Sequence, residues 1–184
     1  MRQLRWICAH CSRDAVMETV FHISGAIAVA ATLMMLTRLN AVHALLYLVV
    51  SLLAVAIVFY TLGAPFAAAL EVIIYAGAIM VLFVFVVMLL NLGRAAVVME
   101  RRWLSTVSWS GPFILAAALV AEFVYLLRQS PASAYPVVVG PAEVGRALFG
   151  PYVLGVELAS LLLLGGIVAA YHLGRRLPSK PEAE

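Results

Sequence analysis

ALEVIIYAGAIMVLFVFVVMLLN, residues 69–91, is the stretch that decides the fold of this chain. It carries no charged residue after Glu71 and is apolar on every side of a helix. A bilayer core of about 30 Å is crossed by about 20 apolar residues in a helix, so this run is long enough to span a membrane. Its length and its lack of a two-residue period favour a helix over the strands of a membrane barrel.

Four further apolar runs flank this stretch, and a Gly-Ala-Pro break at residues 63–65 separates it from the run before. Of the 184 residues, 65% are hydrophobic and 11% are charged, whereas soluble domains average about 45–50% apolar and about 25% charged residues. This composition excludes a soluble enzyme, a disordered chain and a disulfide scaffold, and the net charge of +3 forms no basic patch for nucleic acid. We therefore predict an all-α membrane protein with five transmembrane helices, at about residues 19–37, 42–62, 66–91, 111–127 and 152–173.

The distribution of Lys and Arg predicts the orientation of these spans. Seven basic residues fall on the side that holds the C-terminus and five on the other, and three of those five lie in residues 1–16. Met17 is an equally good translation start, so residues 1–16 are a candidate start-site extension, without which the split is seven to two. The C-terminus is then cytoplasmic and the N-terminus outside, with a five-helix membrane domain at residues 17–174 and a solvated tail at residues 175–184.

No motif in the chain predicts a catalytic or metal site. Cys8 and Cys11 have C-x-x-C spacing with His10 between them, but a zinc site needs four ligands, and an incidental pair of thiols is the simpler interpretation. His43 and His172 lie near predicted helix ends, where a solvated or hydrogen-bonded histidine is commoner than a metal ligand. We expect no catalytic residue, no metal and no cofactor on this chain.

Three carboxylates fall inside the predicted spans, namely Glu71, Glu157 and Glu122. A carboxylate near the bilayer centre costs about 2.5–3.5 kcal/mol, so each is a candidate functional group. In the predicted orientation all three lie about 9 Å inside the outer ends of their helices and form one layer. Two interpretations stay open: the three groups exchange protons along a hydrated path, or they snorkel outward and make structural hydrogen bonds.

Tyr75 and the small residues after it set the third span apart. Tyr75 lies four residues after Glu71, on the same helix face, and is followed by Ala76, Gly77 and Ala78. Small residues let a neighbouring helix approach closely. A mid-helix glycine also costs about 1 kcal/mol relative to alanine and marks a place where a helix can kink or accept an inserted residue. The residues are consistent with a packing role and with a deformable segment.

Three segments resemble one protein family. Residues 69–91 resemble the third transmembrane helix of subunit J of proton-pumping NADH:quinone oxidoreductase, respiratory complex I, whose mitochondrially encoded counterpart is subunit 6. NAVHALLYL at residues 40–48 and FGPYVLGVELASLLLLGGIVAAYH at residues 149–172 resemble its second and fifth helices. The resemblance extends from Met17 to about His172, and the sequence departs from the family pattern at Glu122, where an apolar residue is usual.

The resemblance implies a membrane-arm subunit in the inner membrane of a bacterium, packed against subunits A, H, K and N near the quinone-binding region. The FMN, iron–sulfur clusters and quinone that carry electrons from NADH would belong to other subunits. In this family the third helix can carry a π-bulge, here at Tyr75 to Met80, and the helix rotates between open and closed states. The resemblance therefore implies that Tyr75, Gly77, Ala78 and Met80 gate a hydrated connection between the quinone cavity and the antiporter-like subunits.

Two other functions stay open on the sequence alone. One is a related membrane subunit of a multisubunit sodium/proton antiporter or a membrane-bound hydrogenase, which the neighbouring genes would distinguish. The other is a purely structural spacer, which alanine substitutions of Glu71 and Glu157 would test through proton pumping.

Overall fold

The computed structural model describes residues 2–38, 41–90, 106–129 and 138–175, and it describes the side chains of these ranges except at residues 2–15, 90, 106–109 and 129. All regular elements in these ranges are helices, and no strand occurs in them. Five helices are long and apolar enough to cross a membrane, which confirms the predicted fold class and number of spans. The chain divides into two compact units, Met1–Val139 and Gly140–Glu184.

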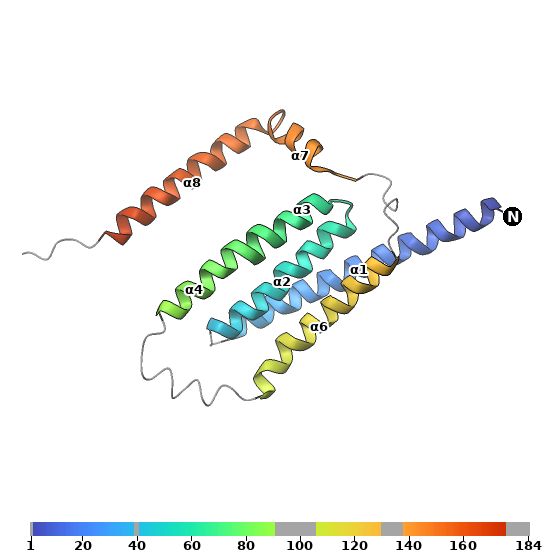
Figure 1. Ribbon diagram of the computed structural model, residues 1–184, viewed down its shortest axis with the longest axis horizontal. Coiled ribbons are helices and arrows are strands. Elements are labelled where there is room, and N and C mark those ends of the chain that lie inside the picture. Colours follow the sequence, from blue (N-terminus) through green and yellow to red (C-terminus); the bar gives the residue numbers. More distant parts are fainter. Residues whose placement is uncertain (1, 39–40, 91–105, 130–137, 176–184) are drawn as a thin grey trace, which may run out of the picture. The chain divides into compact units, whose positions relative to one another are not determined.

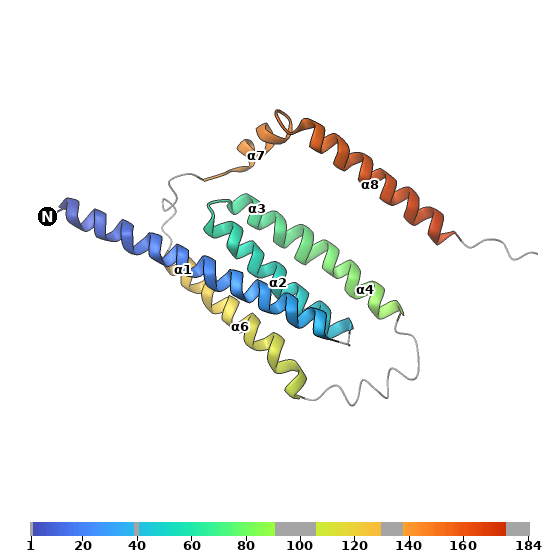
Figure 2. The same ribbon diagram turned by 180° about the vertical axis from the view of Figure 1, so that it is seen from behind.

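The first unit holds four of the five spans. They are α1 (Arg2–Thr37), α2 (Ala41–Thr61), a third span made of α3 (Pro65–Leu70), η1 (Glu71–Ile79) and α4 (Met80–Leu90), and α6 (Thr106–Gln129). Within this unit α2 contacts α1, all three parts of the third span, and α6 (Figures 1 and 2). The second helix is therefore the one around which the others pack.

Small residues in α1 and α2 allow these two helices to lie close together. Ala31 of α1 and Ala54 of α2 are both fully buried in the core of the unit. Beside them the hydroxyls of Thr32 and Ser51 form a hydrogen bond of 2.9 Å, and Ser51 also donates to the carbonyl oxygen of Ala28 at 3.1 Å. Interhelical bonds of this kind replace the hydrophobic driving force that helices lose in lipid.

Tyr47 joins α2 to the helix ends of α1 and α6. Its side chain is 1% exposed, and Arg38 both stacks over the ring at 5.2 Å and donates to the hydroxyl at 3.3 Å. Gly111 of α6 lies directly against the hydroxyl, because a Cβ built on this glycine would come within 2.1 Å of it. The glycine thus allows α6 to approach the tyrosine.

The predicted break between the second and third spans is a tight turn. Gly63 has φ +79°, a left-handed conformation that a residue with a Cβ rarely adopts. Pro65 occupies the first position of α3, where its missing N–H leaves no helical bond unmade. The carbonyl of Gly63 accepts a hydrogen bond of 3.0 Å from the N–H of Val139, which ties a later segment of the chain to this turn.

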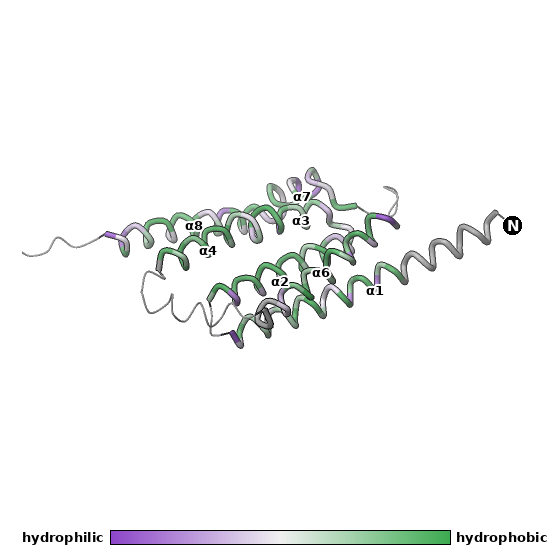
Figure 3. The backbone as a smooth tube through the Cα atoms, turned by 60° about the horizontal axis from the view of Figure 1, so that its bottom comes forward, coloured by the Kyte–Doolittle hydropathy of each residue, from purple (hydrophilic) through white to green (hydrophobic). Residues whose placement is uncertain are grey.

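The second unit contains α7 (Pro141–Leu148) and α8 (Val153–Gly174), which contact each other. The Glu143 carboxylate accepts a hydrogen bond from the N–H of Gly140 and so caps the start of α7. Every residue of α8 except Val156 is exposed. Its apolar surface, visible in Figure 3 as a predominantly green tube, makes it the fifth candidate span.

Two helices extend beyond the predicted spans. The fourth span, predicted at about residues 111–127, agrees with the apolar stretch Ser110–Arg128, and α6 itself begins one turn earlier, at Thr106. Proline leaves only the i−4 bond of its own residue unmade, so the turn before Pro112 can still be helical. The helix α1 begins at Arg2 and continues without a break into the first candidate span, Val16–Thr37, and the start-site extension at residues 1–16 stays a prediction. The connection before the fifth span includes α7, whose eight residues are too few for a periodic signal.

Candidate functional site in the third span

The third span changes its hydrogen-bond register in the middle. At its start the N–H of Glu71 still bonds to the carbonyls of Ala67 and Ala68. From Glu71 to Ile79 the backbone is a π-helix of nine residues, and at its end the N–H of Met80 bonds to the carbonyls of Tyr75 and Gly77. Because π-helical segments are rare and are frequently found at functional sites, this segment is the candidate site. It overlaps the predicted bulge at residues 75–80 and begins four residues earlier.

Gly77 allows the backbone to pack closely inside the π-helix. A Cβ built on Gly77 would lie 3.2 Å from the carbonyl oxygen of Val72, five residues back, which is closer than such atoms usually come. The contact is with backbone, so it could be relieved only by shifting the helix itself. Glycine at this position therefore favours the π register, while an α-helix would be more stable with alanine there.

The predicted gating residues differ in their surroundings. Tyr75 is 50% exposed, Ala78 is exposed and Gly77 is half-buried, whereas Met80 is only 2% exposed. Met80 thus anchors the end of the π-helix in the core of the unit, and the π-helix itself buries no residue. The role of these four residues as a gate stays a prediction.

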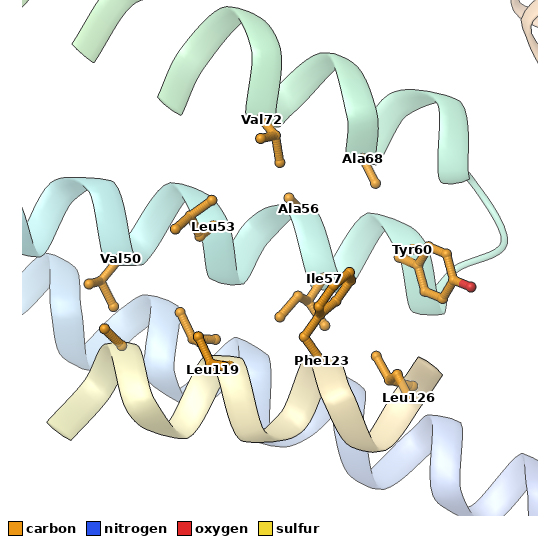
Figure 4. A pocket seen from close by; sticks show the side chains of 12 residues that line it. Val50, Leu53, Ala56, Ile57, Tyr60, Ala68, Val72, Leu119, Phe123 and Leu126 are labelled. Atoms are coloured by element: carbon orange, nitrogen blue, oxygen red, sulfur yellow. The ribbon is translucent and has the colours of Figure 1, made fainter. Parts of the chain in front are cut away.

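An apolar groove of about 360 Å³ lies beside the π-helix. Ala68 and Val72 line it from the third span, and Leu119, Phe123 and Leu126 of α6 line it from the opposite side (Figure 4). Residues of α2, including Ala56 and Ile57, line it between them. The groove therefore leaves open space between the third span and α6, at the start of the π-helix.

The three intramembrane carboxylates have different surroundings. Glu71 is the first residue of η1 and is half-buried. Glu122 of α6 has both carboxylate oxygens buried and lines a groove between α1 and α6 that no residue of the third span shares. Glu157 lies exposed on α8, in the second unit. The predicted layer of three acids stays a prediction, and the structure assigns no shared pocket to Glu71 and Glu122.

Metal chemistry receives no support from the described part of the chain, where no three His, Cys, Asp or Glu residues are grouped so that they could hold an ion. The side chains of Cys8 and Cys11 lie outside the described residues. His43 is 8% exposed near the start of α2, and His172 is exposed near the end of α8.

Two polar contacts were missed by the sequence reasoning. One is the bond between Thr32 and Ser51, and the other is the contact of Arg38 and Gly111 with Tyr47. The signal was present, because hydroxyl side chains inside apolar runs commonly bond to a neighbouring helix. What the sequence could not provide was the pairing of residues from different helices.

These features define the class of the protein: a small, multi-pass helical membrane protein whose third span contains a π-helix. The chain belongs to the NADH-ubiquinone/plastoquinone oxidoreductase chain 6 family, whose sequence model matches residues 31–173. The match covers the four described spans beyond α1, and it confirms the family resemblance seen in the sequence.

The chain is also similar to bacterial proteins that are named as subunit J of NADH-quinone oxidoreductase. NADH-quinone oxidoreductase subunit J of Pseudomonas aeruginosa is 56% identical over 162 residues, which are 87% of this chain and 98% of the relative. The subunit J of Escherichia coli is 55% identical over 160 residues, 86% of this chain and 87% of the relative. The subunit J of Buchnera aphidicola from Schizaphis graminum is 46% identical, over 86% of this chain and 98% of the relative.

Proposed function

We propose that this chain is a membrane-arm subunit of a proton-translocating NADH:quinone oxidoreductase, in the position of subunit J, and that its third span helps to couple quinone reduction to proton movement. The π-helix from Glu71 to Ile79, in a chain of this family, is the observation that carries the proposal. A catalytic centre is not part of the role. The FMN, the iron–sulfur clusters and the quinone of such a complex would be bound by other subunits.

The π-helix supplies a physical means of coupling. A π-helical turn holds an extra residue, so a return to the α register would rotate the chain that follows by about 100°. In this chain the rotated part would be α4, with Met80 moving out of its buried position and Tyr75 changing the direction of its ring. Such a two-state element is what a coupling device needs, because the two registers can differ by only a small free energy.

The groove beside the π-helix supports the same proposal. A rotating helix needs adjacent space, and about 360 Å³ of apolar space adjoins Ala68 and Val72. The small side chains of Ala76 and Ala78 also present little bulk to a neighbouring helix. By contrast 39% of α2 is buried within the chain, against 6% of the third span, so we expect α2 to remain fixed while the third span moves.

The surroundings of the subunit are part of the proposal. We infer a bacterial inner membrane, with the N-terminus outside and the C-terminus in the cytoplasm, as the Lys and Arg distribution predicts. Subunits A, H, K and N are the proposed neighbours. The largely exposed surface of the third span is consistent with such contacts, since only 6% of this span is buried within the chain.

The test is a pair of substitutions in the assembled complex, Gly77→Leu and Tyr75→Phe. We expect each to lower NADH:quinone reduction and proton pumping in inverted membrane vesicles, with Gly77→Leu lowering them by about tenfold because it blocks the π register. NADH oxidation by a water-soluble artificial acceptor should be unchanged, since it bypasses the membrane arm.

Gly165→Ala is the matched control, because Gly165 lies in the regular helix α8 and a Cβ there has open space. It should leave both activities as they are. Unaltered pumping in Gly77→Leu and Tyr75→Phe, in a fully assembled complex, would leave the chain with the role of a structural spacer.

A further inference from the structure

Glu122 is a carboxyl group whose surroundings do not match its polarity. It lies in the second half of α6, about two turns before the helix ends, and both of its carboxylate oxygens are buried with no hydrogen-bond partner among the described residues. The groove of about 550 Å³ that it lines, between α1 and α6, has mostly apolar walls, formed by residues such as Val20, Ile23, Ala118 and Ala121. An ionised carboxylate without donors is strongly disfavoured in such a setting.

Ser24 of α1 is a second buried polar group without a hydrogen-bond partner. Its side chain is fully buried, and its hydroxyl oxygen also lacks a hydrogen-bond partner of standard geometry. The same hydroxyl lies close enough to the Glu122 carboxyl group to interact with it, although the two do not form a hydrogen bond in the structure. Two unsatisfied groups from two different helices therefore adjoin each other.

Among the residues whose side chains the structure describes, no charged group lines the groove as a counter-charge for the carboxyl group. Tyr125 is the one other titratable residue of this described set that lines the groove, and its side chain is 46% exposed. Glu18 and His22 of α1 and Arg128 of α6 are exposed and do not line the groove. The titratable residues of α2, which packs against both helices, do not line it either.

Counting donors decides which form of the carboxyl group fits. An ionised carboxylate only accepts hydrogen bonds, and neither of the two buried oxygens of Glu122 receives one from the described residues. A protonated acid brings its own donor, and a single O–H···O bond from it to the serine oxygen satisfies one group on each helix.

We propose that Glu122 and Ser24 form an intramembrane proton-binding site, in which the neutral Glu122 acid donates a hydrogen bond to the Ser24 hydroxyl oxygen and so fastens α6 to α1. The ligand of the site is a proton. This inference is independent of the proposed function, since it concerns the first and fourth spans and does not involve the π-helix.

Infrared difference spectra of the assembled complex in lipid test the protonation directly. Subtraction of Glu122→Gln from the unmodified complex should reveal the C=O band of a neutral carboxylic acid, and Ser24→Ala should shift that band because its hydrogen bond is lost. Glu18→Gln, a substitution at an exposed carboxylate of α1, should leave the band unchanged. A carboxylate band in place of the acid band would overturn the proposal, as would an acid band that Ser24→Ala does not move.

The proposed bond between α6 and α1 is tested by exposing the complex to detergent and measuring the fraction of this chain that stays in the complex. Glutamine keeps an N–H donor at the same place, so Glu122→Gln should leave the fraction of this chain retained in the complex within about twofold of the original. Ser24→Ala and Glu122→Leu each leave one buried polar group unpaired or remove the bond, and should lower the retained fraction by about fivefold. If Glu122→Gln is as labile as Glu122→Leu, a hydrogen-bond donor at this position does not fasten α6 to α1, and the proposal fails.

Discussion

The second and third spans of this chain are joined by a short turn and are both apolar, yet they differ in burial and in helix register. In α2, 39% of the span is buried within the chain, the helix is regular, and its hydroxyl side chains bond to α1. The third span is the most apolar of the five, but only 6% of it is buried, and for nine residues it leaves the α register. The difference teaches that apolar character in a membrane span predicts insertion in lipid, whereas close packing depends on small residues and paired polar groups.

The strongest test of this comparison is the same substitution on both helices. Val50 of α2 is 5% exposed and Val81 of α4 is 66% exposed. Val50→Phe should overpack the core at a cost of about 1–3 kcal/mol and lower the amount of this chain in membranes, measured by quantitative blotting. Val81→Phe should leave the amount unchanged; an equal loss for both would mean that the third span is packed as tightly as the second.

A slightly smaller effect is expected where α6 meets Tyr47. Gly111→Ala places a Cβ where the tyrosine hydroxyl lies, and the ring is too buried to swing away freely. We expect a loss of about 2 kcal/mol in stability, seen as a lower unfolding temperature of the complex in mild detergent. Tyr47→Phe should partly rescue Gly111→Ala, because the nearest remaining ring atom would then be 3.2 Å away. Absence of any rescue would contradict the contact.

A milder substitution than those already proposed sharpens the comparison at the π-helix. Gly77→Ala adds about 1 kcal/mol of α-helical preference and crowds the Val72 carbonyl, so the α register should become about fivefold more populated. Quinone reduction should fall accordingly, and a cryo-electron microscopy map of the variant complex would show the register. Gly165→Ala in α8 supplies the control, with a neutral or stabilising effect expected. A π-helix that survives unchanged with full activity would refute this reading of Gly77.

The smallest expected effect is the loss of one bond between α1 and α2. Ser51→Ala should cost about 0.6 kcal/mol, the typical value for a hydrogen bond between membrane helices. A double-mutant cycle with Thr32→Val, scored by unfolding temperature, isolates the 2.9 Å bond between the two hydroxyls. Strictly additive effects would show that this bond does not hold α2 in place.

The sequence predicted the parts of the fold that depend on one helix at a time. Charge-free runs located all five spans, and Gly63 and Pro65 located the turn, because each signal is local. The family resemblance also implied a π-bulge at Tyr75 to Met80, which the observed π-helix overlaps. The start of the π-helix at residue 71 was not predicted, because the change of register depends on backbone hydrogen bonds over nine residues and not on any one side chain.

The contacts between helices could not be predicted in the same way. Nothing in the sequence pairs Ser24 with Glu122 or Gly111 with Tyr47, since these residues are far apart along the chain and become neighbours only when α1, α2 and α6 pack. The short helix α7 was missed for a related reason, because its capping bond from Gly140 to Glu143 stabilises too few residues to produce a period.

The turn at Gly63 has a consequence for biogenesis. Only residues 62–64 separate α2 from α3, so we expect the two spans to enter the membrane together, as one helical hairpin. A bulky β-branched residue at position 63 would disfavour this turn during synthesis. It would thereby delay membrane integration and expose the nascent chain to quality-control proteases.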